Sequence, residues 1–355
     1  MNKALLDQYS DYLITSTRQT SCTGLSKILG NSISHDKFTR FLAKNDFGSK
    51  QLWNLVKQTV REVEIEDGVL VFDDSISEKP YTDESELICW HYDHSKSRSI
   101  KGINLLSGFY VGKDDIGLPV CYDLIKKDIL GSDGKKTSSK SKNERMRDCL
   151  QHAIDNSVKF KWVITDIWFG SAENMKFIQQ KGKAFIMPLK TNRKVALSEK
   201  DKSQGKYVPI ESLQLEPGTC LRVYLEKIHS AVTLIKEEYV NKDNSTGVLY
   251  LVCSDLTATY QQITTFYQKR WRVEEYHKSL KNNASLALSP TRTVKTQSNH
   301  LFLSLIGYCK LELFRMRKGL NHFALKAKLY TTAMVAAFQQ LRKLNDGIQL
   351  KFEFA

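Results

Sequence analysis

The sequence predicts an α/β protein in which a mixed β-sheet packs against helices and further helical regions lie at both ends of the chain. Two observations lead to this expectation. Short β-branched runs, such as VLVF and WVIT, alternate with segments of helical spacing in the middle of the chain, whereas residues 1–62 and 291–355 are mainly helical in pattern. The 355 residues, 41% of them hydrophobic, are enough to bury a large core.

Residues 1–62 are predicted to form helices, and two of these suit a helix-turn-helix. Thr23 caps a first short helix that ends at Gly30 and Asn31, and Ser34 caps a second. The second helix directs apolar side chains inward and basic ones outward, namely Phe38, Phe41 and Leu42 against Lys37, Arg40 and Lys44. A basic second helix is typical of motifs that contact DNA, although any small helical hairpin gives the same pattern.

Residues 63–204 are predicted to hold most of the sheet. Three strand patterns come first, GVLVFDDS, IKGINLLSGFYVG and GLPVCYDLIKK, while HYDHSKSRS and residues 131–142 are expected to be loops. A helix capped by Ser141, the strand KWVITD, a helix ended by Gly182 and the strand KAFIMPLK follow. Three strands with short connections, followed by alternating helices and strands, are typical of a mixed sheet of the ribonuclease-H type.

The rest of the chain is predicted to contain an inserted β-rich module and long helices. Residues 205–255 return to strand patterns. Residues 257–283 have the spacing of one long helix, and helical spacing resumes from 299 to 345.

The charge of the chain indicates a polyanionic partner. Lys and Arg outnumber Asp and Glu by 53 to 39, so the formal net charge is +14. Such an excess is self-repulsive, and attraction to nucleic acid is its usual function. We expect a cytoplasmic protein, because no apolar run reaches the roughly 18 residues of a membrane span and the N-terminus does not resemble a signal peptide. The seven cysteines are scattered singly, which argues against a zinc site or a disulfide framework.

Two of the strand patterns end in acidic residues. Asp73 and Asp74 follow VLVF, and Asp166 follows WVIT. Phosphodiester chemistry with two Mg²⁺ ions, roughly 3.5–4 Å apart, needs carboxylate oxygens held by rigid neighbouring elements. These acids are therefore candidate metal ligands, and a third acid on a helix packed over the same edge of the sheet would complete the set.

The segment YQKRWRVEEYHKSLK offers the third acid. At about 100° per residue, a polar stripe roughly 60° wide holds Tyr267, Arg270, Glu274 and Lys281, with Trp271 and Lys278 on its border. A face turned to the core would be apolar, so this stripe is either a solvated face with salt bridges or part of a site. Glu275 lies about 100° away from Glu274, off the stripe. Glu274 is therefore the candidate ligand.

The spacing Y-x2-R-x3-E-x6-K resembles the signature of the DDE transposases of bacterial insertion sequences, in the group named for the fourth insertion-sequence family. Tyr267, Arg270, Glu274 and Lys281 match it at all four positions. WVITDIWFGSAENMKFI resembles the family's segment with the second acid, VFDDS resembles the segment with the first, and TGLSKILGNSISHDKFTRFL resembles its N-terminal part.

This resemblance implies a ribonuclease-H-like catalytic core with a β-insertion before the last catalytic helix. The expected regions are a helical DNA-binding region at 1–62, the first part of the core at 63–204, the β-insertion at 205–255, the catalytic helix at 256–290 and a helical C-terminal region at 291–355. The resemblance also implies cut-and-paste transposition. A homodimer would bind the terminal inverted repeats of double-stranded DNA, cleave the transposon ends and join the freed 3′-OH to target DNA, in a bacterial cytoplasm and associated with the nucleoid.

The resemblance assigns roles to individual residues. The catalytic and metal-binding residues would be Asp74, Asp166 and Glu274, holding two Mg²⁺ ions for which Mn²⁺ can substitute. The residues that bind a DNA phosphate would be Tyr267, Arg270 and Lys281. Trp271 and Lys278, on the border of the same stripe, are further candidates for DNA binding. A bidentate Arg and a Lys point charge suit the binding of a phosphate near the cleaved end.

The first acid is a choice between two neighbours. Strand alternation directs Asp73 and Asp74 to opposite faces of the sheet without selecting either. In similar proteins the first acid directly precedes Thr or Ser, which favours Asp74 because Ser75 follows it. His91 and His94 lack an acid or Cys partner at ligand spacing, and Trp168 is expected to pack in the core.

Two other functions fit parts of the pattern. A DNA-binding protein that has lost catalysis would act as a repressor or an architectural factor, but the intact acids argue against it. A ribonuclease-H-like nuclease would cleave nucleic acid without strand transfer, and the joining of cleaved ends to a target separates it from a transposase.

Overall fold

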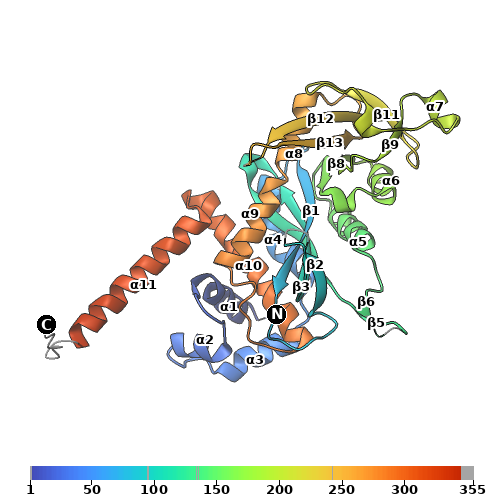
Figure 1. Cartoon of the computed structure of the whole chain (residues 1–355). Coiled ribbons are helices and arrows are strands. Elements are labelled where there is room, and N and C mark those ends of the chain that lie inside the picture. The colour runs from blue at the N-terminus through green and yellow to red at the C-terminus, as the bar shows by residue number, and fades with distance from the viewer. Residues whose placement is uncertain (1, 94–95, 133, 135, 242, 345–355) are drawn as a thin grey trace, which may run out of the picture.

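One mixed sheet of eleven strands organises the protein, whose computed structural model describes residues 2–93, 96–132, 134, 136–241 and 243–344 (Figure 1). Its strands are β1 (Val69–Glu78), β2 (Cys89–Asp93), β3 (Arg98–Val111), β4 (Gly117–Ile125), β7 (Trp162–Thr165), β8 (Ala184–Leu189), β9 (Lys194–Ala196), β10 (Val208–Pro209), β11 (Leu221–Leu225), β12 (Val232–Val240) and β13 (Thr246–Cys253). A separate small hairpin consists of β5 (Ile129–Leu130) and β6 (Lys136–Thr137).

Helices cover the sheet and form both ends of the described chain. The α-helices are α1 (Lys3–Thr15), α2 (Cys22–Ile28), α3 (His35–Lys44), α4 (Ser49–Val63), α5 (Lys142–Asp155), α6 (Ala172–Gln180), α7 (Glu199–Ser203), α8 (Tyr260–Gln268), α9 (Trp271–Asn283), α10 (Val294–Lys318) and α11 (His322–Leu344). Three short 3₁₀ helices are η1 (Lys113–Asp115), η2 (Ile167–Phe169) and η3 (Ile210–Ser212). The predicted mixed α/β architecture is confirmed.

The strand order explains how the sheet is assembled. Hydrogen bonding runs in the order β10-β9-β11-β12-β13-β8-β7-β1-β3-β2, and β4 pairs with β3 beside β2. The central strands β1, β7 and β8 are parallel, whereas β3 is antiparallel to β1 and to β4. Parallel neighbours require crossover helices, and α5 and α6 supply them before β7 and before β8.

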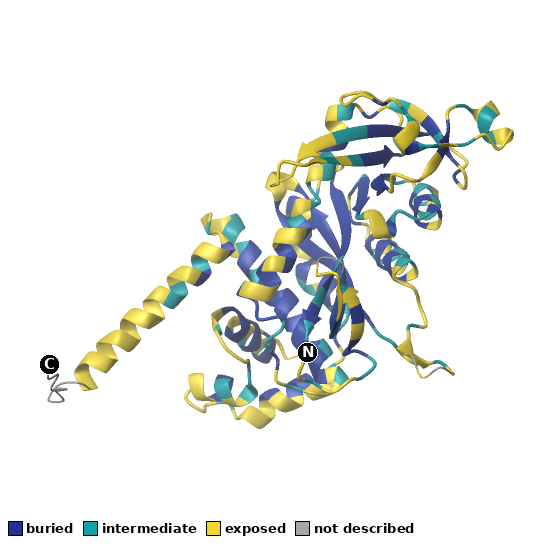
Figure 2. Ribbon diagram, in the orientation of Figure 1, coloured by how far each residue is buried: buried dark blue, intermediate teal, exposed yellow. Residues whose placement is uncertain are grey.

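The two faces of the sheet are covered by different helices (Figures 1 and 2). On one face the Cys121 thiol of β4 donates to the carbonyl of Cys149 in α5, at 3.3 Å. On the other face Phe109 of β3 stacks on Tyr276 of α9, with ring centroids 4.6 Å apart, and lies edge-on to Tyr308 of α10. Burial of large side chains on both faces is the main source of stability for a sheet of this kind.

Two loops predicted from the sequence contain strands instead. HYDHSKSRS was expected to be a loop, but Cys89–Asp93 pairs with the start of β3, so that Trp90 lies opposite Lys101. Residues 131–142 were expected to be loop, but Lys136–Thr137 pairs with Ile129–Leu130. His94 lies outside the described residues. The side chains of β2 alternate: Cys89 and His91 are buried, whereas Trp90 and Tyr92 are exposed. Such alternation is typical of a strand, and the loop prediction did not take it into account.

The long helix predicted for 257–283 is two helices. α8 ends at Gln268 and α9 begins at Trp271, and the amides of Lys269 and Arg270 donate to carbonyls three residues back. This tight turn divides the predicted helix just before Glu274. The first short N-terminal helix is capped by Ser21, whose side chain accepts from the Gly24 amide, and not by Thr23.

The β-rich stretch after residue 204 extends the central sheet. β13 is antiparallel to β8, with Val252 opposite Met187, and β12, β11, β9 and β10 continue outward from β13. The strands of this stretch are therefore hydrogen-bonded to the core without a break.

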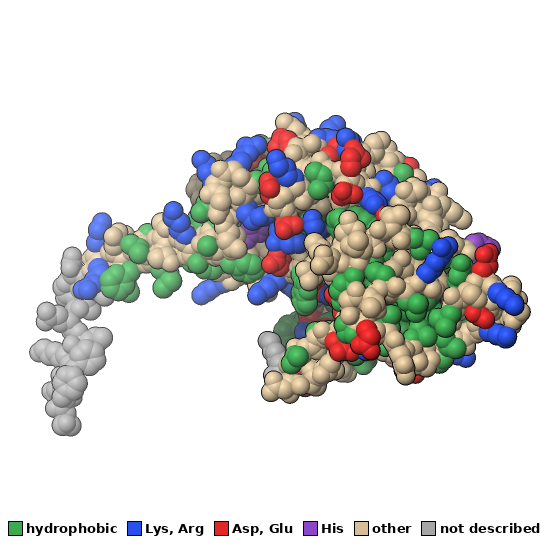
Figure 3. Space-filling view, turned by 90° about the horizontal axis from the view of Figure 1, so that it is seen from above, with side chains coloured by type: hydrophobic (Ala, Val, Ile, Leu, Met, Phe, Trp, Pro, Cys, Tyr) green, Lys and Arg blue, Asp and Glu red, His purple; other side chains and the backbone are tan. Residues whose placement is uncertain are grey.

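The terminal helices differ in their packing. α1 packs along α10, where Tyr9 hydrogen bonds to His300 at 3.2 Å. α11 projects away from the body in Figure 1, and Figure 3 shows hydrophobic side chains along this arm. Met334, Phe338 and Leu344 are among those exposed there. In the part of the chain that the structure describes, no helix combines the length and the apolar character required to cross a bilayer.

Gly102 offers a test of the pairing between β1 and β3. A Cβ atom at this position would lie 2.3 Å from the carbonyl oxygen of Ser77, a backbone atom that cannot move without parting the strands. We expect Gly102→Ala to lower the free energy of unfolding by about 2–3 kcal/mol in urea denaturation. Gly48→Ala is the matched control, because the nearest neighbour of its Cβ would be 3.7 Å away; equal stability losses in both variants would contradict this account.

Candidate active site

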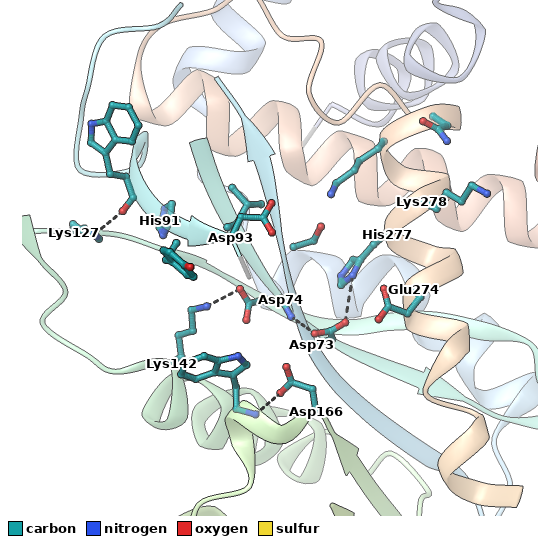
Figure 4. Close-up of a pocket in the computed structure, with 17 residues that line it drawn as sticks. Asp73, Asp74, His91, Asp93, Lys127, Lys142, Asp166, Glu274, His277 and Lys278 are labelled. Atoms are coloured by element: carbon teal, nitrogen blue, oxygen red, sulfur yellow. Dashed lines mark hydrogen bonds and ion pairs between the residues drawn. The ribbon is translucent and has the colours of Figure 1, made fainter. Parts of the chain in front are cut away.

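A cavity of about 840 Å³ opens beside the carboxyl end of β7. Its lining combines acids with bases and aromatic rings (Figure 4), namely Asp73, Asp74, Asp93, Asp166 and Glu274 with Lys127, Lys142, Lys278, Lys281, His91 and His277, and with Trp90, Tyr92 and Trp168. All three predicted acids line it, together with the alternative Asp73.

The pairing of β1 with β7 brings the first two acidic positions together. The parallel register places Phe72 opposite Thr165, and the next residues are Asp73 and Asp166. β7 stops there, whereas β1 continues to Glu78, so the prediction that the first strand ends at the acids was wrong. A crevice at the end of a parallel strand is where open α/β sheets bind ligands.

Asp73 faces α9 and is nearly buried. Its neighbour across the ladder is Ser107, whose hydroxyl lies 3.2 Å from that of Tyr276 in α9. Burial, reinforced by the charges of Asp166 and Glu274, raises the pKa of Asp73 well above its usual range. His277 Nδ1 lies 3.7 Å from Asp73 Oδ2, and burial lowers the pKa of His277 to about 3, so this imidazole is neutral.

Asp74 points to the opposite side, toward α5. Its Oδ2 atom accepts from Asn104 Nδ2 and from Lys142 Nζ, each at 2.7 Å. Asn104 is fully buried on β3, so it fixes the orientation of the Asp74 carboxylate from within the sheet. Strand alternation therefore separates the two neighbours as expected, although both reach the cavity.

Asp166 caps the short turn that follows β7. Its Oδ1 atom accepts from the amide of Trp168 at 3.0 Å. Burial, followed by the nearby Asp74 charge, raises the pKa of Asp166 to about 6. Trp168 was expected to pack in the core, but it is 55% exposed and lines the cavity, because the η2 turn carries it outward.

Glu274 lies in the first turn of α9 beside two members of the same motif. Arg270 donates to Glu274 Oε1 at 3.0 Å, and its positive charge acts on the phenol of Tyr267. Burial raises the pKa of Tyr267 to about 12, so the phenol keeps its proton. Arg270, in the turn between α8 and α9, therefore pairs with Glu274 and acts electrostatically on Tyr267.

The remaining predicted DNA-binding residues divide into two groups. Lys278 and Lys281 line the cavity. Trp271 is 64% exposed and does not line it, although the Arg270 guanidinium lies 5.5 Å from its ring centroid. Glu275 pairs with Arg272 and contributes nothing to the cavity lining, in agreement with its predicted separation from Glu274.

Several cavity residues were missed from the sequence. His277 follows Glu274 by three residues, a helical spacing that could have revealed it. Lys142 follows the predicted cap Ser141, and no local pattern indicates that its side chain reaches β1. His91, dismissed as a metal ligand, is buried and lies 3.2 Å from the Cys89 sulfur.

A buried carboxylate anchors α9 from the side away from Asp73. Glu312 of α10 accepts from the Gly117 amide at 2.9 Å and from Arg315, and its Oε2 atom lies 3.0 Å from His322 Nε2. Burial alone would raise the pKa of Glu312, but these hydrogen bonds lower it to about 2. Arg272 of α9 lies 3.8 Å from the same carboxylate and donates to the Asp115 carbonyl. The helix that carries Glu274 is thus held on two sides.

The chemical type of the donor atoms in the cavity, carboxylate oxygens, suits a divalent cation. Carboxylate oxygens are the ligands that Mg²⁺ prefers. Burial, and after it the charges of the neighbouring acids, raises the pKa values of Asp73 and Asp166, and a bound cation would oppose both effects. Among the described residues, no three His, Cys, Asp or Glu side chains already surround a common metal position. Instead, Lys142 and Arg270 pair with two of the acids.

Comparison with protein families identifies the class of protein. A family model described as a transposase DDE domain matches residues 114–310, and one described as a DDE superfamily endonuclease matches residues 2–207. Each match covers more than half of the chain. The chain therefore belongs to the DDE transposase family; it is a nuclease-type enzyme whose partner is DNA. Endonucleases of this superfamily generally use divalent metal ions. No curated protein sequence matches the chain.

Two solved structures show only distant similarity. The Drosophila P element transposase strand transfer complex is 10% identical, with a TM-score of 0.26 and coverage of 89% of this chain and 82% of that chain. Marinitoga piezophila Argonaute in complex with 5′ OH guide RNA and target DNA is 7% identical, with a TM-score of 0.23 and coverage of 68% and 30%. TM-scores this low carry no conclusion about fold or activity.

The raised pKa of Asp166 predicts how stability depends on pH without metal. The unfolded chain loses this proton at its ordinary pKa, below the folded value of about 6, so the free energy of unfolding falls as pH rises between them. Asp166→Asn should therefore raise the free energy of unfolding by about 2–3 kcal/mol at neutral pH and leave it unchanged near pH 4. Urea denaturation in the presence of EDTA measures this free energy. Asp114→Asn, in the exposed turn after β3, should change neither value. A loss of stability at neutral pH in Asp166→Asn would contradict this assignment.

Proposed function

We propose that this enzyme is a cut-and-paste DNA transposase with a ribonuclease-H-like catalytic core, whose active site is the cavity at the end of β7. The observation that carries the proposal is the meeting of Asp74, Asp166 and Glu274 at one cavity, from elements far apart in the sequence. The Y-x2-R-x3-E-x6-K motif and the matching family models support it. The proposed setting is a homodimeric synaptic complex on inverted repeats, in a bacterial cytoplasm and associated with the nucleoid.

The proposed reaction consists of two phosphoryl transfers. In the first, a water oxygen attacks phosphorus, the bond from phosphorus to the 3′ oxygen breaks, and that oxygen leaves with a proton as a free 3′-OH. In the second, this 3′ oxygen attacks a phosphorus of the target strand, and a second 3′ oxygen leaves. Each step replaces one P–O bond with another, so catalysis depends on positioning and on the neutralisation of charge.

The proposed metal ligands are Asp74, Asp166 and Glu274, with Asp73 as the alternative first acid. When bound, two divalent metal ions, Mg²⁺ or Mn²⁺, supply positive charge to the attacking and leaving oxygens. Asn104 orients the Asp74 carboxylate, and the Trp168 amide orients that of Asp166. Asp73 faces α9, the helix that carries Glu274, and this placement supports Asp73 as the first metal ligand. The resemblance of the segment VFDDS to the family favours Asp74.

The proposed phosphate contacts come from the same helix and the turn before it. Arg270 is paired with Glu274, so its guanidinium is oriented before DNA binds. Lys278 and Lys281 lie on the cavity side of α9 and supply point charges. These groups would hold the scissile phosphate near the acids.

A separate DNA contact is proposed for the N-terminal region. Lys37, Arg40 and Lys44 are exposed on α3, while Phe38, Phe41 and Leu42 are buried beneath them. α3 follows α2 after a short turn through Gly30 and Asn31, both in the left-handed region. This arrangement supports a role for 1–62 in recognising the transposon end.

Glu274→Gln tests the catalytic assignment. We expect it to reduce cleavage of DNA that carries the flanks of the gene by more than about 100-fold in Mg²⁺, since changes outside the ligand shell already cost roughly 10- to 100-fold. Asp166→Asn should have the same effect. Glu275→Gln is the matched control, because its side chain pairs with Arg272 away from the cavity. Wild-type cleavage by Glu274→Gln would exclude this site.

Asp73→Asn and Asp74→Asn, assayed together, separate the two neighbours. The variant of the true ligand should lose cleavage and weaken metal binding, whereas the other should retain metal affinity.

Joining of the cleaved ends to a second DNA supports a transposase, and cleavage without joining supports a nuclease.

Lys281→Ala tests the phosphate contacts. Because each neutralised phosphate releases counterions, we expect binding to any duplex to weaken and the slope of log affinity against log salt to decrease by about 1. Lys159→Ala is the control, since Lys159 precedes β7 at the end of the strand away from Asp166. Fluorescence anisotropy over a range of salt concentrations measures the affinity and its salt dependence for each variant. An affinity that does not depend on salt would exclude the proposed DNA contacts.

A further inference from the structure

Lys142 enters the cavity from the first turn of α5 and lies outside the motif that identifies the active site. Its Nζ atom is 2.7 Å from Asp74 Oδ2, an oxygen that also accepts from Asn104 at 2.7 Å. The Asp74 side chain is only 13% exposed. This oxygen therefore already has two donors, and one of them carries a full positive charge.

Lys142 and Arg270 both neutralise cavity acids, but they are held differently. Arg270 pairs with Glu274 and lies over the Trp271 ring, and its side chain is 19% exposed. Lys142 is 42% exposed, and a lysine ammonium is a single charge on a flexible stem. An ion pair that is partly open to solvent contributes little to stability, so Lys142 can leave Asp74 at low cost.

The charge of the cavity depends on what occupies the position beside Asp74. Negative charges are crowded around Asp73 and Asp166, and Lys142 offsets part of this charge without a metal ion. A divalent ion that binds Asp74 competes with Lys142, because like charges repel and Asn104 and Lys142 already occupy the Oδ2 oxygen. Its attachment to α5 keeps the displaced ammonium at the cavity that a DNA phosphate would enter.

We propose that Lys142 takes the place of a metal ion at Asp74 in the metal-free protein and binds a phosphate of the DNA substrate once it is displaced. The inference rests on the proposed function, because it requires metal and DNA to meet at this cavity. It gives Lys142 two successive partners, a protein carboxylate and a substrate phosphate.

Metal affinity without DNA is the first test. Titration calorimetry with Mn²⁺ should show Lys142→Met binding about two- to fivefold more tightly than wild type, the change expected on removal of a partly exposed competing ion pair. Lys142→Arg retains the charge and should stay near wild type. Lys140→Met is the matched control, because Lys140 is two residues away and pairs with Asp148 outside the cavity. Thermal melts verify that each variant is folded.

DNA affinity with and without metal is the second test. In EDTA, Lys142 is occupied by Asp74, so Lys142→Met should bind a duplex as wild type does. With Ca²⁺, an oxygen-seeking ion used as the probe, the variant should bind several-fold more weakly than wild type. The loss should therefore appear only when metal is present, whereas Lys140→Met should show no such difference.

The outcomes separate this inference from the proposed function. If wild type binds metal and cleaves DNA but Lys142→Met has unchanged or weaker Mn²⁺ affinity, Lys142 does not compete at Asp74 and the inference is wrong. An equal loss of DNA affinity in EDTA and in Ca²⁺ would also overturn it, since Lys142 would then be a phosphate contact that metal does not control. Wild-type protein that binds no metal would refute both proposals.

Discussion

The parallel pairing of β1 with β7 is the constraint on which the site depends. Its register places Phe72 opposite Thr165, so the residues that follow bring acids onto neighbouring strands where β7 stops. Burial at this junction makes negative charge costly, as the raised pKa of Asp166 shows. The lysines around the cavity offset part of this negative charge, and helix α9 adds a further carboxylate, Glu274, to it.

The catalytic helix is positioned by contacts on more than one side. Tyr276 stacks on Phe109 of the sheet, and Arg272 approaches the buried Glu312 of α10. Glu274 itself is partly exposed, so its placement comes from its neighbours on α9 and not from its own packing. A rigid helix whose functional carboxylate is open to solvent leaves that carboxylate accessible to another partner.

Much of the fold could be predicted from the sequence because its signals are local. Strand runs, the Ser141 cap and the stop at Gly182 depend on neighbouring residues, and the polar stripe correctly separated Glu274 from Glu275. Strand β2 was missed because it is short and runs into a polar segment of the sequence. The break at Lys269–Arg270 contains neither Gly nor Pro. Lys142 and Asn104 could not be assigned to the site, because their contacts with Asp74 depend on tertiary structure. The choice between Asp73 and Asp74 remains a prediction, since both reach the cavity.

The unbroken ladder between the β-rich stretch and the core has a mechanical consequence. Because β13 is bonded to β8 and β8 to β7, a load applied to the outer strands would pass through successive backbone hydrogen bonds to the strand that carries Asp166. A module joined only by flexible linkers would dissipate such a load. The outer strands and the strand that carries Asp166 are therefore mechanically coupled through one continuous hydrogen-bonded sheet.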